Sequence, residues 1–395
     1  MKILMVHPHD IYSLAEPWAV RIVYFAKEFE KKGHTVELAY FPLEWNRQKA
    51  WRLSKNIRLI PLPRKHGPHI LISNILVLWR LAARVDIVHL QKCFYHAAIP
   101  AMLAALFRGK HLHYDWDDWE VKIYEVSTYP SLLRNVIRKF LSILENTIPL
   151  VADTVSVASR RLKIECNKII RRGDMIFDAH VGADLKQFNP LVSGLAVKEK
   201  FGITRPLILY LGQLHGGQYV ELFIRTAKKL ISDYHQNLSF MIVGDGYMAN
   251  DLKKMTNNLD LSRDIIFTGA VSHELVPQYV AAADICVACF EENEVTSCKS
   301  PLKIVEYLAS GKAIVASKVG EVPEMLQDSG VLVAPGDVES LASGVIRVLS
   351  DSEFKDKIQK SARKRAEEKY NWEVTASNLL KAYENRVVKN KNYRL

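Results

Sequence analysis

Apolar and polar positions along the first half of the chain follow two alternating periods. Short apolar runs rich in β-branched and aromatic residues lie at 2–8, 35–41, 86–91, 110–116 and 153–159. Between the first two runs, residues 16–34 place their apolar side chains at helical spacing and end near Gly33. Strands that alternate with helices predict a parallel sheet that is covered by helices on both faces.

The second half repeats this alternation. Strand-like runs lie at 206–214, 238–246, 264–269, 284–290, 313–317 and 330–335, with helical patterns between them and helix expected from 337 to the end. The pattern is lost at 188–206, where proline and glycine cluster. We therefore predict an α/β protein with two doubly wound, Rossmann-like domains at 1–190 and 191–374. A helix from about 375 is expected to pack back on the first domain.

Composition agrees with a soluble two-domain protein. Of 395 residues, 49% are hydrophobic and 25% are charged, which excludes an intrinsically disordered chain. No run approaches the roughly 20 apolar residues of a membrane span, and the N-terminal run predicts a buried strand rather than a signal peptide. A cytoplasmic protein is therefore expected. The five cysteines are scattered, and Cys286 and Cys289 lie within an apolar run, which predicts reduced core thiols.

The formal net charge of +11 is compatible with nucleic acid, an anionic membrane or phosphorylated small molecules as partners. No aromatic–basic recognition pattern accompanies it, so we expect no nucleic-acid binding. Basic residues gather at 160–173 and in the amphipathic pattern of 129–148, which includes Arg134, Arg138 and Lys139. They predict either peripheral contact with the inner face of the cell membrane or a solvated helix face packed on its own sheet.

Four strand-end segments of the second domain are candidates for one site. They lie at 212–218, 244–247, 268–272 and 297–317. A helix that starts near Ser300–Pro301 carries unpaired N–H groups and a partial positive charge, which suit a phosphate, and Lys303 adds a point charge. Glu306, one turn further on, could accept hydrogen bonds from a ribose diol. The alternatives are plain turns for the glycines and a solvated helix face for Glu306.

The order of these segments resembles a known family. Residues 244–252, 265–287, 300–326 and 330–351 look like the C-terminal domain of the GT-B glycosyltransferases of family 4, and 29–38, 182–190 and 370–384 extend the likeness over most of the chain. The resemblance implies a GT-B fold, in which two Rossmann-like domains face each other across a cleft. It also implies a retaining, hexosyltransferase-type enzyme that needs no metal ion or other cofactor. The donor would be a UDP- or GDP-sugar, and the acceptor would be a glycan or a lipid-linked molecule.

The resemblance assigns the donor to the second domain and the acceptor to the first. Glu306 would then hold the ribose, the amides at 300–302 with Lys303 would hold the diphosphate, and the turns at 244–246 and 268–270 would lie near the base. The residues predicted to bind the donor are Gly212, Gln213, Gln218, Gly244, Gly246, Thr268, Gly269, Ala270, Ser300, Pro301, Leu302, Lys303 and Glu306.

Three positions depart from the family pattern. Cys298 stands where the family has a glutamate that contacts the donor sugar, and Gln213 and Gln218 replace an arginine and a lysine that bind the diphosphate. Two lost charges weaken a leaving-group site, unless Lys299, Lys303 and the helix start compensate. The carboxylates that could replace the missing one from the preceding loop are Glu291, Glu292 and Glu294. The alternatives therefore include a binding or scaffold protein that has lost donor contacts, and a GT-B phosphorylase or epimerase.

The first domain carries several carboxylates at one strand end, within 111–125. Asp117 and Asp118 are, with Glu306, the predicted catalytic residues, because similar pairs in some family members orient the acceptor hydroxyl or the donor sugar. Alternatively, they cap the following helix. Asp115 and Asp117 also form a D-x-D, the metal motif of the other glycosyltransferase fold. The two-domain pattern argues against that fold, and no metal site is predicted.

Aromatic and basic side chains of the first domain add further candidates. Two tryptophans in this segment, Trp116 and Trp119, either stack on a sugar ring or fill the core. Arg21, on the helix after the first strand, is predicted to contact phosphate or to carry surface charge. The side chains expected to face the ligand from the loop before it are His7, His9 and Asp10.

Overall fold

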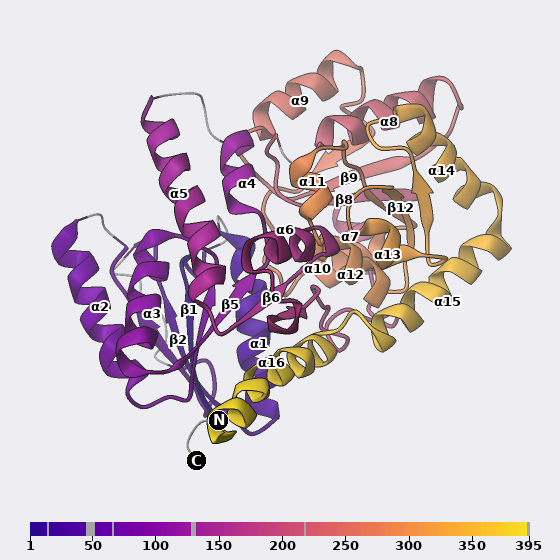
Figure 1. The fold of residues 1–395 in the computed structure, drawn as a ribbon. Coiled ribbons are helices and arrows are strands. Elements are labelled where there is room, and N and C mark those ends of the chain that lie inside the picture. The colour runs from indigo at the N-terminus through magenta and orange to yellow at the C-terminus, as the bar shows by residue number, and fades with distance from the viewer. Residues whose placement is uncertain (14–15, 45–51, 65–66, 128–131, 217–218, 393–395) are drawn as a thin grey trace. The chain divides into compact units, whose positions relative to one another are not determined.

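The computed structural model describes residues 1–13, 16–44, 52–64, 67–127, 132–216 and 219–392. They form two compact units (Figure 1): unit 1 comprises Met1–His180 and Trp372–Leu395, and unit 2 comprises Val181–Asn371. Each unit is built on one parallel sheet with helices on both faces, as the alternating sequence pattern predicts.

The sheet of unit 1 has seven strands in the order β3-β2-β1-β4-β5-β6-β7. Their bounds are Lys2–His7 (β1), Thr35–Tyr40 (β2), Ile57–Pro61 (β3), Ile87–Gln91 (β4), His111–Trp116 (β5), Thr154–Val157 (β6) and Ile176–Asp178 (β7). The order reverses between β1 and β4, and ligands of such sheets bind beyond the strand ends at this reversal. The strands β3 and β7 lie outside the apolar runs from which the other five were predicted.

Helices alternate with these strands. They are η1 (Pro17–Ala19), α1 (Val20–Lys31), α2 (Pro68–Ala82), α3 (Tyr95–Arg108), α4 (Glu120–Ser127), α5 (Leu132–Val151), α6 (Arg160–Ile170), η2 (Gly173–Met175) and α16 (Trp372–Asn392). The helix expected over 16–34 begins as a 3₁₀ turn at Pro17 and becomes α-helical at Val20. The last helix, α16, returns to unit 1, where the ring of Trp372 stacks on Tyr24 with 5.5 Å between centroids.

Unit 2 repeats the topology with six strands in the order β10-β9-β8-β11-β12-β13. The strands are Leu207–Leu211 (β8), Ser239–Val243 (β9), Ile265–Phe267 (β10), Ile285–Ala288 (β11), Ala313–Ser317 (β12) and Val331–Val333 (β13). The helices are α7 (Leu195–Lys200), α8 (Val220–Ser232), α9 (Ala249–Asn258), α10 (Val276–Ala282), α11 (Glu294–Cys298), α12 (Leu302–Ala309), α13 (Val322–Leu326), α14 (Val338–Ser350) and α15 (Ser352–Glu368). The order reverses here between β8 and β11.

The C-terminal region is not one continuous helix, as the sequence pattern suggested. Asp351 ends α14 and caps α15, because its carboxylate accepts a hydrogen bond from Phe354 N over 2.8 Å. A second break at 369–371 separates α15 in unit 2 from α16 in unit 1. An aspartate at an N-cap stabilises a new helix start, so a helical pattern on both sides of it does not imply one helix.

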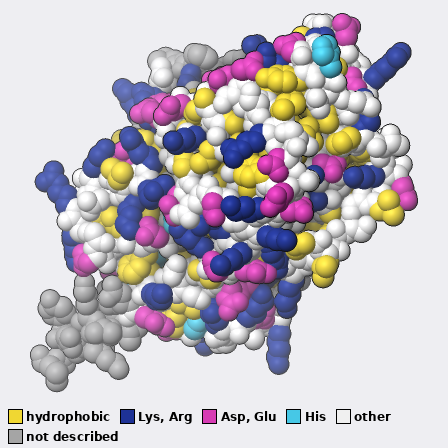
Figure 2. Space-filling view, turned by 90° about the vertical axis from the view of Figure 1, so that its right-hand side faces the viewer, with side chains coloured by type: hydrophobic (Ala, Val, Ile, Leu, Met, Phe, Trp, Pro, Cys, Tyr) yellow, Lys and Arg dark blue, Asp and Glu magenta, His cyan; other side chains and the backbone are white. Residues whose placement is uncertain are grey.

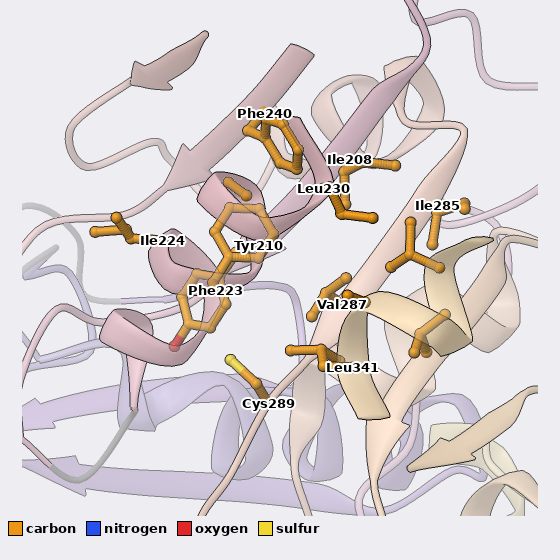
Figure 3. Packing of buried hydrophobic residues seen from close by; sticks show 14 of the residues in the cluster. Ile208, Tyr210, Phe223, Ile224, Leu230, Phe240, Ile285, Val287, Cys289 and Leu341 are labelled. Carbon is orange, nitrogen blue, oxygen red and sulfur yellow. The ribbon is translucent and has the colours of Figure 1, made fainter. Parts of the chain in front are cut away.

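One hydrophobic cluster packs helices against one face of the sheet of unit 2 (Figure 3). Ile208, Tyr210 and Phe240 on the strands pack with Phe223 on α8 and Leu341 on α14. The cysteines described in both units are buried and free, and burial raises the pKa of Cys286 and of Cys289 to about 12. The prediction of reduced core thiols is therefore confirmed.

The surface carries mixed charge on the face shown in Figure 2, where lysine and arginine side chains are interspersed with aspartate and glutamate. Mixed charges of this kind are usual for a solvated surface, whereas a nucleic-acid contact gathers basic side chains in a stripe. Within the part of the chain that the structure describes, no helix is both long enough and apolar enough for a membrane span.

Candidate active site

The carboxyl ends of β8, β9 and β10 converge through backbone contacts between glycines. Gly244 N donates a hydrogen bond to Gly269 O over 3.1 Å. A Cβ on Gly244 would lie 1.9 Å from Gly212 O, and one on Gly246 would lie 2.3 Å from Leu214 O. These glycines are therefore required by the close approach of neighbouring turns. They shape the candidate donor site, because no side chain fits where the turns meet.

The start of α12 forms the fourth part of this site. Pro301 is the N-cap, with ψ of 117°, so the helix begins at Leu302 and not at the proline as predicted. The preceding Ser300 is buried, and its hydroxyl has no hydrogen-bond partner among the described residues. A buried hydroxyl beside the first N–H groups of a helix suits an anionic oxygen.

Lys303 places a cation next to the first glycine turn. Its ammonium donates to Tyr210 Oη over 3.1 Å and lies 4.2 Å from the centre of that ring. A Cβ on Gly212 would lie 2.7 Å from Lys303 Nζ, so a side chain there would displace the ammonium. Burial lowers the pKa of Lys303 to about 7, and the charge of Lys299 acts in the same direction. Burial and the charges of both lysines lower the pKa of His215 to about 4, so the three side chains form one basic cluster.

Glu306 lies one turn after Lys303 on α12. Its side chain is only 4% exposed, so the alternative of a solvated helix face is wrong. Its Oε1 accepts a hydrogen bond from His273 Nε2 over 2.7 Å. His273 follows the predicted turn after β10, in which Thr268 donates its hydroxyl to Gly269 O over 2.8 Å. The hydrogen bond between His273 and Glu306 joins α12 to that turn and fixes the orientation of the Glu306 carboxylate.

The three departures from the family pattern have different surroundings. Cys298 is buried at the end of α11. Gln213 is half-buried on the first glycine turn, and Gln218 lies outside the described residues. The glutamates considered as replacements are all exposed: Glu291, Glu292 and Glu294. Lys303 lies beside the first glycine turn, where Gln213 stands in place of the family's arginine, and Lys299 adds a second positive charge close to Lys303.

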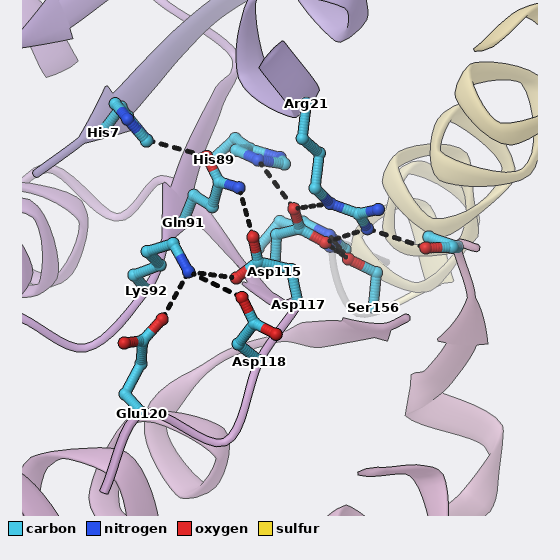
Figure 4. Close-up of polar contacts among 12 residues, drawn as sticks. His7, Arg21, His89, Gln91, Lys92, Asp115, Asp117, Asp118, Glu120 and Ser156 are labelled. Carbon is cyan, nitrogen blue, oxygen red and sulfur yellow. Dashed lines mark hydrogen bonds and ion pairs between the residues drawn. The ribbon is translucent and has the colours of Figure 1, made fainter. Parts of the chain in front are cut away.

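In unit 1, the carboxylates after β5 surround a lysine from the neighbouring strand (Figure 4). Lys92 follows β4 directly, and its ammonium lies 3.2 Å from Asp117 Oδ1 and 3.3 Å from Asp118 Oδ2. It also donates to Glu120. Burial alone would lower the pKa of Lys92, but the three carboxylates raise it well above its usual value. Burial likewise raises the pKa of Asp117, and that of Glu120 to about 7, although Lys92 opposes both shifts.

Neighbouring side chains hold this carboxylate cluster in place. Gln91 Nε2 donates to Asp117 Oδ2 over 2.7 Å, and Gln91 Oε1 lies 2.8 Å from His7 Nδ1. Glu145 on α5 accepts hydrogen bonds from the first two backbone N–H groups of α4, over 2.8 and 3.2 Å. The cap of α4 is therefore Glu145, and the alternative that Asp117 or Asp118 caps this helix is wrong.

The two aspartates of the D-x-D do not act together. Asp115 accepts two hydrogen bonds from Arg21, over 2.7 and 2.8 Å, and one from Ser156 Oγ over 2.5 Å. Although burial would raise the pKa of Asp115, Arg21 lowers it far below its usual value. The oxygens of the carboxylate cluster lie close enough to hold a metal ion, but the ammonium of Lys92 takes the place of a cation among them.

Other side chains predicted near the ligand in unit 1 support the fold. Arg21 is buried in its ion pair and donates to Ala179 O over 2.7 Å, so the prediction of surface charge is wrong and its phosphate role lacks support. His9 Nδ1 lies 3.2 Å from Glu16 Oε1, and Asp10 accepts hydrogen bonds from two backbone N–H groups. Trp116 is buried as a core residue and donates to Glu145, whereas Trp119 is half-buried.

Comparison with known proteins gives one family for both units. Residues 19–170 match the family model described as Glycosyltransferase Family 4, and residues 205–351 match the one described as Glycosyl transferases group 1. The chain belongs to the family 4 glycosyltransferases. A curated relative, an uncharacterized glycosyltransferase from Methanocaldococcus jannaschii, is 30% identical over 181 residues, which are 45% of this chain and 44% of the relative. The chain spans about half the length of the curated relatives that it matches first.

Solved structures confirm that this family 4 chain has the GT-B fold. Sucrose-phosphate synthase from Thermosynechococcus elongatus superposes with a TM-score of 0.78 at 18% identity, covering 98% of this chain and 100% of the other. Anabaena Alr3699/HepE in complex with UDP-glucose gives a TM-score of 0.76 at 15% identity, with coverage of 98% and 100%.

Sequence reasoning missed four side chains of this family 4 chain that the structure places at the candidate sites. They are Lys92, Gln91, Glu145 and His273. Gln91 and Lys92 had a usable signal, because two polar residues directly after an apolar strand lie at the carboxyl edge of the sheet. His273 directly follows a predicted site segment. Glu145 had none, because a glutamate within an amphipathic helix usually faces water.

Proposed function

We propose that this chain is a retaining glycosyltransferase that moves a hexosyl group from a nucleotide diphosphate-sugar to a hydroxyl of a glycan or lipid-linked acceptor, without a metal ion. The observation that carries the proposal is the basic cluster beside the start of α12. There, a buried lysine of lowered pKa and the buried hydroxyl of Ser300 lie next to glycine turns at the strand reversal of unit 2. That combination suits a diphosphate.

The proposed donor lies along the strand ends of unit 2. The diphosphate contacts Lys303, Ser300 and the first amides of α12, and the ribose diol donates to Glu306. The base lies near the turns at 244–246 and 268–270. The complex of Anabaena Alr3699/HepE with UDP-glucose supports a nucleotide-sugar as the ligand of this fold. A UDP- or GDP-sugar is the donor that we infer.

Charge develops on the leaving diphosphate when the glycosidic bond breaks. Lys303 and the backbone N–H groups of α12 would stabilise that charge without reorganising, which lowers the barrier more than an equal contact in water. The leaving phosphate takes up the acceptor proton, and the acceptor attacks from the same face of the sugar. This route needs no protein nucleophile and no metal ion.

The proposed acceptor end of the reaction uses the carboxylates of unit 1. Asp117 is held by Gln91 and by the ammonium of Lys92, and Asp118 is the more exposed of the pair, with 29% of its side chain accessible. An oriented carboxylate with accessible oxygens can accept a hydrogen bond from an acceptor hydroxyl and fix its direction.

Thermal shift with UDP, GDP, ADP and their common sugar conjugates tests the proposed donor site. We expect one nucleotide to raise the melting temperature by about 3–7 °C at a hundredfold excess over its Kd. Glu306→Ala should lose this shift because the ribose contact is gone. Glu324→Ala is the matched control, since Glu324 is a half-buried glutamate of unit 2 that pairs with Lys369.

The result of this screen separates two functions. No shift with any nucleotide would contradict the donor proposal, and it would favour a binding or scaffold protein whose donor contacts were lost at Cys298, Gln213 and Gln218. A shift that persists in Glu306→Ala would keep the transferase but overturn the role of this carboxylate.

We also propose that α5 docks unit 1 on an anionic membrane at the inner face of the cell membrane. Apolar side chains are exposed by 42–61% at four positions in the first part of α5, namely Val136, Ile137, Phe140 and Ile143, and Leu150 and Val151 are exposed at its end. Lys139 is exposed beside them. Arg134 and Arg138 instead donate to Glu125 of α4, so the apolar residues carry more of the contact than the predicted basic ones. An exposed apolar helix face on a chain of net charge +11 fits a negatively charged bilayer.

Sedimentation with lipid vesicles tests this docking. Wild type should bind phosphatidylglycerol vesicles and not phosphatidylcholine vesicles, and Ile143→Glu should reduce binding at least tenfold because a charge enters the apolar contact. Asn135→Glu adds the same charge at an exposed polar position of the same helix and should keep most of the binding. Equal losses in both variants would show that net charge alone drives the contact.

A further inference from the structure

A cavity of about 360 Å³ opens in unit 1 between α4, α5 and α6. Trp116 and Trp119 line it from the segment after β5, and Glu145 and Ser142 line it from α5. Its volume lies at the lower end of the range of small-molecule sites. The helices around it lie side by side in the fold (Figure 1).

The charges that line this cavity are paired within its own wall. Glu125 of α4 lies 3.1 Å from Arg138 and 3.4 Å from Lys122, and Glu165 of α6 lies 3.0 Å from Lys168. A strongly anionic ligand would compete with Glu125 and Glu165 for their cations and break these ion pairs. An apolar ligand would displace water from the ion pairs without replacing its hydrogen bonds, which is costly. The wall therefore favours an uncharged ligand with many hydroxyl groups, which can accept from the cations and donate to the carboxylates.

The cavity also offers an aromatic face and a buried acid. The ring of Trp119 is half-buried in the wall. Burial and the charge of Glu120 raise the pKa of Glu145 to about 8, so this carboxyl holds its proton at neutral pH. The contacts of Glu145 with Trp116 and with α4 all use it as an acceptor. Its O–H is then available to donate to a ligand hydroxyl.

The cavity and the carboxylate cluster share one segment of chain. Residues 116–121 carry Asp117, Asp118 and Glu120 around Lys92, and the same segment carries Trp116 and Trp119 in the cavity wall. The hydrogen bond from Glu120 N to Glu145 Oε1, 2.8 Å long, links the two directly. A ligand seated in the cavity would therefore lie close to the residues proposed to orient the acceptor hydroxyl.

We propose that this cavity is an acceptor subsite that binds an uncharged sugar ring of the acceptor, stacked on Trp119 and hydrogen-bonded by Glu145. The proposal rests on the proposed transferase function and gives the acceptor a chemical class. The acceptor is a glycan or glycolipid whose sugar ring enters unit 1, and the lipid part of a glycolipid would remain outside this cavity.

Saturation-transfer NMR with methyl glycosides of glucose, galactose, mannose and N-acetylglucosamine tests the subsite without any donor. Wild type should bind at least one of them, and Trp119→Ala should weaken that binding roughly tenfold because the stacking face is lost. Ser142→Trp, which fills the cavity while keeping Trp119, should have the same effect. Trp79→Ala is the control. Trp79 lies on α2, where its ring stacks against the guanidinium of Arg108 from α3, and it does not line the cavity.

The outcomes are separable from those of the donor test. Two results would overturn the subsite: no saturation transfer to any glycoside from the wild-type protein, or equal transfer from wild type and Trp119→Ala. Each variant must keep the wild-type circular dichroism spectrum and the same nucleotide-induced thermal shift, so that a folding defect is recognised. A wild-type chain that binds glycosides but shows no nucleotide shift would contradict the donor proposal and not the subsite.

Discussion

Lys92→Met should lower the free energy of unfolding by about 3–5 kcal/mol at pH 8, because it leaves three carboxylates with no ammonium among them. Lys92 is 3% exposed, and its partners Asp117 and Glu120 are 11% and 9% exposed, so water replaces the lost cation poorly. Lys92 also has φ of +63°, a left-handed conformation that costs about 1–2 kcal/mol for a residue with a side chain. The ion cluster offsets that cost in the wild-type protein.

The deficit of this variant should depend on pH. The pKa of Glu120 is raised to about 7 even with Lys92 present, and it rises further without it. A carboxyl group whose pKa is higher in the folded than in the unfolded chain makes stability fall as pH rises between the two values. Lys92→Met should therefore recover part of its lost stability at pH 5, where Glu120 is protonated, and be least stable above pH 7.

Urea unfolding followed by tryptophan fluorescence at pH 5 and pH 8 checks this prediction. The triple variant Lys92→Met, Asp117→Asn, Glu120→Gln is the matched control, since it removes the cation and its two more buried carboxylates and leaves only Asp118, which is 29% exposed. It should regain most of the stability. A Lys92→Met protein with the same deficit at both pH values would mean that lost packing, and not unpaired charge, destabilises it.

The strand-end loops of unit 2 could be predicted from sequence because their signals are local. A glycine turn directly after an apolar strand, as at Gly212 and Gly244, lies at the carboxyl edge of a parallel sheet whatever the rest of the fold does. The same holds for Lys303 and Glu306, which are three residues apart on one helix and therefore share a face. The structure adds the reason why Gly244 and Gly246 are glycines: each lies against the backbone of a neighbouring turn, which leaves no room for a side chain.

The contacts of unit 1 could not be predicted in the same way because they join distant parts of the chain. Arg21 pairs with Asp115 across 94 residues, and Lys92 reaches Glu120 across 28. Sequence patterns show that Asp115, Asp117 and Asp118 end one strand but do not show which cation each one meets. Alternation along a strand would place Asp115 and Asp117 on one face, but β5 ends at Trp116, so Asp117 lies beyond the strand. Only the order of the strands then assigns a partner to each aspartate.

Boundaries between helices were the other error, and their cause is also physical. The pattern from 337 onward is helical throughout, but Asp351 caps a new helix because its short side chain bonds the backbone of Phe354. Helical periodicity measures which face of a segment is apolar, and it does not register a cap that changes the direction of the axis. The domain roles predicted from the family, donor in the second and acceptor in the first, stay predictions until ligands are tested.

Lys303→Met should weaken the binding of the nucleotide-sugar by roughly 10–150-fold at pH 6.5, the loss expected for a charged hydrogen bond in a buried site. The lysine must be protonated to bind the diphosphate. In the free protein, burial holds its pKa at about 7, and a bound diphosphate raises it. Binding therefore takes up a proton above pH 7, and wild-type affinity should fall by up to about tenfold per pH unit above pH 7 until it reaches the affinity of Lys303→Met.

Calorimetric titration with the nucleotide-sugar found by thermal shift, at pH 6.5 to 9, checks this dependence. A sugar diphosphate ester has no phosphate group that titrates in this range, and the pKa of about 4 for His215 lies well below it. The affinity of Lys303→Met should be constant over the range and should meet the falling wild-type curve at high pH. Uridine or guanosine, which lack phosphate, should bind both proteins with no pH dependence. A wild-type affinity that does not change from pH 6.5 to 9 would show that Lys303 does not contact the diphosphate, and the phosphate site would then rest on Ser300 and the amides of α12.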